Sequence, residues 1–170
     1  PRNQLVQREP LQNFVRVACL TSGCDGVLVL FDADDDCPKE LAPRLQTWAQ
    51  DAAGVVPCVV VLANREFEAW LLGSIAAMRG TSNVREDASV PGDPESVRDA
   101  KGRLEECLRG DVGYSPTVDQ ARLTARLDPA QAFRTCRSFR KLVVAFGALL
   151  RVGETPGAAW PPETWRAGGG

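Results

Sequence analysis

The sequence of 170 residues contains no histidine. This absence excludes Ser-His-Asp and Cys-His catalysis and imidazole metal ligands, and it removes the usual general base near neutral pH. Any catalysis must therefore use carboxylates or the side chains of Lys, Arg, Tyr or Cys. The six cysteines form no Cys-x-x-Cys pair, which argues against a zinc ribbon and against a thioredoxin-type redox site. We expect them to be reduced thiols rather than nucleophiles.

The sequence also lacks a membrane segment and a strong net charge. No apolar stretch approaches the roughly 20 residues of a membrane-spanning helix, and no basic-then-apolar signal opens the chain. We therefore expect a cytoplasmic protein without a membrane contact. The net charge of −2 argues against a surface that binds nucleic acid everywhere, although a local basic patch remains compatible with it. An apolar content of 44% and a charged content of 25% are typical of a globular domain.

The feature that stands out is an apolar run that ends in a cluster of acids. Residues 27–31 (VLVLF) predict a buried strand, and Asp32, Asp34, Asp35 and Asp36 follow it directly. In open α/β folds such strands deliver their last residues to the edge of the sheet where ligands bind. Neighbouring carboxylates raise one another's proton affinity. The cluster is therefore costly unless a cation, backbone N–H groups or water receives it.

This cluster has alternative interpretations. In the first, Asp32, Asp34 and Asp36 are ligands of Mg²⁺ or Mn²⁺, because Mg²⁺ prefers oxygen ligands and is usually held by one or two carboxylates together with phosphate and water. In the second, they form a solvated acidic turn whose last residue, Asp36, caps the next helix. A structural cation is a third alternative.

The strand, acidic turn and helix recur further along the chain. We expect helices near residues 11–20 and 38–53, a second buried strand within residues 55–63, and a helix to Met78 that Asn64 caps. Two parallel strands joined by a helix form a right-handed crossover, which brings Asp32 and Glu66 to the same edge if the strands are neighbours. Residues two apart on a helix point in nearly opposite directions, so we expect Glu66 rather than Glu68 to face Asp32 as a supporting acid.

The second half predicts helices joined by loops. Residues 79–94 predict a surface loop, and helices are expected over 95–108, 117–127 and 129–150. Lys101 is a candidate for stabilising charge in a phosphoryl transition state. The last helix carries Arg134, Arg137, Arg140 and Lys141, which either grip phosphates or form a solvated face. We expect one domain over residues 1–150 and an irregular tail rich in Pro and Gly over 151–170, from which Trp160 and Trp165 can dock.

Four segments, VLVLFDADDDCP, VVVLANREFEAWLLGS, VDQARLTARLD and CRSFRKL, resemble a bacterial family known as domain of unknown function 4276. The resemblance covers most of residues 26–142. It implies an α/β fold of the TOPRIM-like type, with a small, mostly parallel sheet, helices on both of its faces and a helical C-terminal half.

The wider TOPRIM group includes topoisomerases, primases and nucleases, and it has an Asp-x-Asp after a buried strand that binds Mg²⁺. Asp32 and Asp34 match this motif. The group also has a glutamate after an earlier strand, whereas Glu9 precedes a predicted helix and does not match it. Either an upstream strand lies outside this sequence or the member lacks that acid. The resemblance implies Mg²⁺-dependent cleavage or transfer at phosphodiester bonds of nucleic acid. The alternative is a non-catalytic module that binds nucleic acid or a protein partner in a larger, defence-related assembly.

Overall fold

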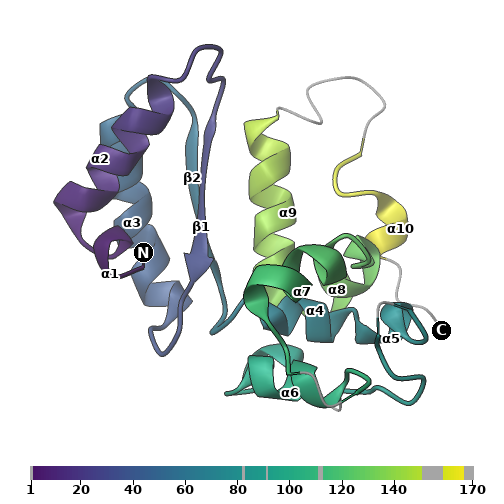
Figure 1. Cartoon of the computed structure of the whole chain (residues 1–170). Helices are drawn as coiled ribbons and strands as arrows, with labels where there is room; N and C mark the ends of the chain where they lie inside the picture. Colours follow the sequence, from purple (N-terminus) through teal and green to yellow (C-terminus); the bar gives the residue numbers. More distant parts are fainter. Residues whose placement is uncertain (1, 82, 91, 111–112, 151–158, 167–170) are drawn as a thin grey trace.

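The computed structural model describes residues 2–81, 83–90, 92–110, 113–150 and 159–166 (Figure 1). The helices and strands are, in chain order, α1 (Arg2–Leu5), α2 (Arg8–Cys19), β1 (Val27–Asp32), α3 (Pro38–Ala53), β2 (Cys58–Ala63), α4 (Glu68–Gly73), α5 (Ile75–Met78), the 3-10 helix η1 (Pro94–Ser96), α6 (Ala100–Glu106), α7 (Pro116–Thr124), α8 (Pro129–Thr135), α9 (Arg137–Leu149) and α10 (Glu163–Arg166). No helix in these ranges is both long enough and apolar enough to cross a bilayer.

The sheet consists of β1 and β2, which are parallel and in register from Val27 opposite Cys58 to Asp32 opposite Ala63. Helix α3 connects them. The predicted α/β fold, with a small parallel sheet and a mostly helical C-terminal half, is confirmed. The two strands end together, so Asp32 and the turn after Ala63 meet at the C-terminal end of the sheet.

The sheet lies between two layers of helices. Figure 1 shows α2 and α3 on one side of the strands and α9 on the other. Leu11 of α2 and Leu45 of α3 are completely buried against the first face. On the second face Ala63 belongs to a separate cluster with Phe139 and Val143 of α9. Burial on both faces suits the continuous apolar run of β2, whose last three residues are buried. The prediction that residues 27–31 form a buried strand is wrong for most of β1, because this strand lies at an edge of the sheet: only Val27 is buried, and Leu30 is 38% exposed.

The outer edge of β2 is partly covered by two glutamines of α3. Gln46 donates from Nε2 to the carbonyl of Cys58 (2.7 Å) and accepts the N–H of Val60 at Oε1 (2.8 Å). Gln50, one turn later, accepts the N–H of Cys58 (3.1 Å) and donates to the carbonyl of Val56 (3.2 Å). The two side-chain amides thus take the positions that a third strand would occupy.

The prediction of one helix over residues 129–150 is wrong, because α8 and α9 are separated at Cys136. This residue has an extended backbone with φ −113° and ψ 118°. Its buried thiol donates to the carbonyl of Ala69 (3.4 Å), and Glu95 receives the first N–H groups of α9. These contacts with distant parts of the chain break a helix whose local periodicity is continuous.

Two predicted helix caps are also wrong. The N-cap of α3 is Cys37 rather than Asp36, because the Asp36 carboxylate pairs with Arg2. The N-cap of α4 is Phe67 rather than Asn64, whose side chain instead donates to the carbonyl of Glu95 (3.3 Å). The segment expected as one helix over 95–108 is divided into η1 and α6.

The tail is only partly described, since residues 151–158 lie outside the described ranges. Within residues 159–166 the prediction of irregular structure is wrong for α10, which forms one helical turn. The predicted docking of the tryptophans is confirmed. Trp160 donates from Nε1 to the carbonyl of Val143 (2.7 Å), and the ring centroid of Trp165 lies 6.0 Å from that of Phe133.

Candidate carboxylate site

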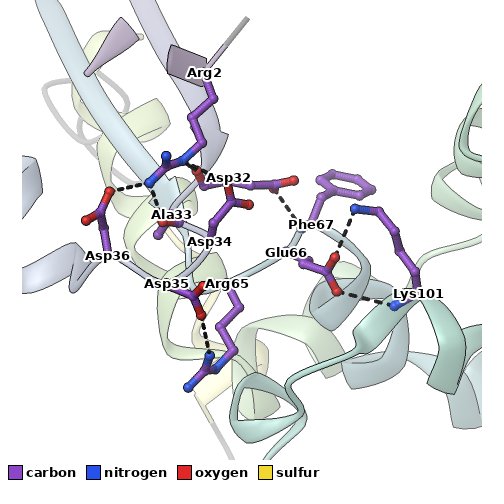
Figure 2. Close-up of polar contacts among 10 residues, drawn as sticks. All are labelled: Arg2, Asp32, Ala33, Asp34, Asp35, Asp36, Arg65, Glu66, Phe67 and Lys101. Atoms are coloured by element: carbon purple, nitrogen blue, oxygen red, sulfur yellow. Dashed lines mark hydrogen bonds and ion pairs between the residues drawn. The ribbon is translucent and has the colours of Figure 1, made fainter. Parts of the chain in front are cut away.

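Asp32, the last residue of β1, directs its carboxylate toward the start of α4. Oδ1 accepts the N–H of Phe67 (2.8 Å; Figure 2). Burial raises the pKa of Asp32 above its ordinary value, and the negative charge of Glu68 raises it further, although the Phe67 N–H and Lys101 act in the opposite direction. An ionised carboxylate at this position is therefore costly without an added positive charge.

The other predicted metal ligands pair with Arg2. Asp34 lies 3.0 Å from the Arg2 Nε, and Asp36 pairs with Arg2 Nη2 (Figure 2). Arg2 also donates to the carbonyls of Asp32 (3.0 Å) and Ala33 (2.7 Å), so it fixes the turn after β1. The Arg2 guanidinium thus compensates the charges of two acids of the cluster, Asp34 and Asp36.

Glu66 and Lys101, the two candidate catalytic residues, lie together. The Lys101 ammonium donates to Glu66 Oε1 (2.9 Å), and Glu66 Oε2 accepts the N–H groups of Ala100 (2.8 Å) and Lys101 (3.3 Å) (Figure 2). Glu66 therefore holds the first turn of α6. The hydrogen bond to Glu66 raises the pKa of Lys101, and the charges of Glu68 and Asp32 add to this shift. Lys101 remains a cation within a set of acids.

Glu68 is the residue that the sequence-based prediction missed. Its side chain is 0% exposed, Oε1 accepts the hydroxyl of Tyr114 (2.9 Å), and the buried Oε2 has no hydrogen-bond partner among the described residues. The expectation that Glu66 and Glu68 point in opposite directions assumed that both lie on one helix. Because α4 begins at Glu68, Glu66 lies in the preceding turn, and both carboxylates interact with Lys101.

Carboxyl groups outnumber cations at this site. Glu66, Glu68 and Asp32 all raise the pKa of Lys101, the ammonium that donates to Glu66. The described residues contain no group of three or more acids, cysteines or histidines placed to hold a metal. Two carboxylates are enough for Mg²⁺ when phosphate and water complete its shell. The buried Oε2 of Glu68, which has no partner among the described residues, is a suitable ligand for such an ion.

The sequence matches a family model described as domain of unknown function (DUF4276) over residues 2–146. The chain belongs to the DUF4276 family. Neither a curated protein nor a solved structure matches it. The matched range contains both strands, the acid cluster, Glu68 and Lys101. The candidate carboxylate site is thus part of the DUF4276 domain.

Proposed function

We propose that this DUF4276 domain cleaves or transfers phosphodiester bonds of nucleic acid with the help of Mg²⁺ or Mn²⁺. The observation that carries the proposal is the buried Oε2 of Glu68, which has no partner among the described residues, on a carboxylate whose charge raises the pKa of Asp32. These two residues would hold the ion. When bound, the ion would stabilise charge on the scissile phosphate and lower the pKa of a water nucleophile.

The surrounding residues have separate roles in this proposal. Lys101 is charged, and its side chain is 44% exposed, so it can contact an anionic phosphate oxygen as charge develops there. Glu66 is a positioning residue because it holds the ammonium of Lys101. Tyr114 donates to Glu68 Oε1, and burial raises the pKa of the phenol, which therefore stays protonated and leaves Oε2 available.

Cleavage assays with DNA and RNA in Mg²⁺ and in Mn²⁺ test this function. We expect Asp32→Asn and Glu68→Gln each to lower the cleavage rate by about a hundredfold or more. Asp35→Asn is the matched control, since the Asp35 side chain is 95% exposed and its carboxylate lies 3.7 Å from the guanidinium of Arg65. Cleavage that survives Asp32→Asn at the wild-type rate would contradict the proposal.

A second candidate function is a non-catalytic module that binds nucleic acid or a protein partner. The pairing of Arg2 with both Asp34 and Asp36 favours it, because two of the predicted metal ligands already have a cation. Calorimetric titration with Mn²⁺ separates the two functions. Binding that is lost in Asp32→Asn and Glu68→Gln but retained in Asp34→Ala supports the enzyme. A folded chain that neither binds the ion nor cleaves nucleic acid supports the module.

A further inference from the structure

A cavity of about 470 Å³ lies along the outer edge of β2, between the N-terminal ends of α3 and α9. This volume is in the range of small-molecule sites, roughly 300 to 1,000 Å³. Val60 and Leu62 line it from the strand, and Lys39, Arg137 and Lys141 line it from the two helices. None of the residues proposed above to hold a metal ion lines this cavity.

Three backbone groups of β2 face this cavity without a partner among the described residues. In a strand, alternate residues direct both their N–H and their C=O to the same edge. The N–H of Val60 bonds outward to Gln46 (2.8 Å), and that of Asn64 bonds outward to the Ser138 hydroxyl (3.1 Å). The C=O of Val60 and both groups of Leu62 must therefore point outward between these two contacts. They offer an acceptor, a donor and an acceptor in sequence.

The walls of the cavity are positively charged. Lys39, Arg137 and Lys141 are exposed, and none of them pairs with an acid in the described ranges. Glu95 is the single acid among the described lining residues, and both of its oxygens already accept N–H groups at the start of α9. Helix α3 also begins here without a side-chain cap, so its positive end adds to the field. The positive charge of these walls therefore favours the binding of an anionic ligand in the cavity.

We propose that this cavity binds a nucleotide, with the base on the open edge of β2 and the phosphate on the three cations. A nucleobase presents a hydrogen-bond donor beside an acceptor, as the C=O of Val60 and the N–H of Leu62 require. An added peptide strand fits less well, because Gln46 and Ser138 leave an open span of only about two residues, or ~7 Å. The span matches one planar ring rather than a strand.

Calorimetric titration of the whole chain with AMP in EDTA tests this site without any contribution from metal-dependent cleavage. We expect AMP to bind, and Arg137→Glu and Lys141→Glu each to weaken it by about tenfold or more. Arg16→Glu, a reversal of an exposed arginine on α2, is the matched control and leaves the affinity unchanged. Absence of AMP binding, or affinity unaffected by both reversals, would overturn the proposal.

Two further ligands test the base and the source of the nucleotide. Ribose 5-phosphate lacks the base, and N6,N6-dimethyl-AMP lacks the donor on its amino group, so we expect both to bind at least about fivefold more weakly than AMP. Equal binding of ribose 5-phosphate and AMP would refute the contact with the strand edge. If a short adenine oligonucleotide binds more tightly than AMP, the natural ligand is a nucleotide within a nucleic-acid strand. If the two bind equally, it is a free nucleotide. Both results support the site. AMP binding by a chain that does not cleave nucleic acid would contradict only the proposed nuclease.

Discussion

Asp32 holds a carboxylate where the fold itself disfavours the charge. Its pKa is raised mainly by burial and then by the charge of Glu68. A folded chain that binds this proton more tightly than the unfolded chain loses stability as pH rises from the ordinary value of 3.8 through the raised value. The ionised carboxylate therefore lowers the stability of the domain at neutral pH, as expected of a residue that serves ligand binding.

Asp32→Asn should therefore raise the stability of the domain. The amide keeps an oxygen for the Phe67 N–H and removes the charge, so we expect a melting temperature above that of the wild type at about pH 7. The difference should disappear below about pH 3, where the wild-type carboxyl is protonated in both states. Thermal denaturation followed by circular dichroism across this pH range, in EDTA, measures it. A lower melting temperature for the variant at neutral pH would show that the carboxylate is already compensated.

At the scale of the elements, the start of α9 joins several distant parts of the chain. Glu95 accepts the N–H groups of Arg137 and Ser138, both at 2.8 Å, and also contacts the Ser138 hydroxyl. That hydroxyl also contacts the indole of Trp70 (2.7 Å) and the N–H of Asn64 (3.1 Å). The Glu95 carboxylate of η1 thus holds the start of α9, and the Ser138 hydroxyl extends this network to α4 and to the turn after β2.

Glu95→Ala should destabilise the domain by about 3 kcal/mol, because it leaves two N–H groups at the start of α9 without their acceptor and removes a negative charge from that helix end. The Glu95 side chain is only 4% exposed, so water replaces it poorly. Urea denaturation gives the free energy of unfolding. Glu86→Ala is the control, since that side chain is 76% exposed and its pair with Arg109 should contribute no more than about 0.5 kcal/mol. Equal losses in the two variants would argue against a special role for Glu95.

The elements that could be predicted from the sequence are those whose pattern is local. The apolar runs of β1 and β2 and the spacing of Leu41 and Leu45 in α3 were sufficient. The break at Cys136 was not predictable, because it depends on Glu95, which lies 41 residues earlier in the chain. The pairing of Glu66 with Lys101 likewise depends on where α6 meets α4.

The candidate site, like the fold, could be predicted only where it depends on local sequence. The strand and acid pattern correctly placed Asp32 at the edge of the sheet, but it could not show that Arg2 compensates Asp34 and Asp36. Glu68 was missed because the direction of its side chain follows from the first residue of α4, and boundaries of helices are the least certain part of a sequence-based prediction. Its burial depends on Tyr114, from a distant loop. The metal-binding and catalytic roles stay predictions.

At the scale of the whole molecule, the two candidate sites flank the end of one strand. Leu62 lines the nucleotide cavity, and its neighbour Ala63 pairs with Asp32. Within the described ranges the sheet is small, with two strands and therefore two outer edges. These edges differ: Gln46 and Gln50 cover much of the outer edge of β2, whereas the outward N–H and C=O groups of Leu28 and Leu30 in β1 have no partner among the described residues.

This asymmetry limits how copies of the chain can polymerise. The open edge of β1 can pair with the same edge of a second copy. The resulting sheet then ends on both sides in a β2 edge where Gln46 and Gln50 leave only a short span free, so growth stops at two chains rather than continuing into a fibril. We expect the double variant Gln46→Ala, Gln50→Ala to form thioflavin-positive, light-scattering fibrils at high concentration, whereas Thr47→Ala, an exposed change on the same helix, does not. A double variant as free of fibrils as the wild type would contradict this. If the double variant does form fibrils, the two side-chain amides of α3 are what prevents the β2 edge from pairing with further copies.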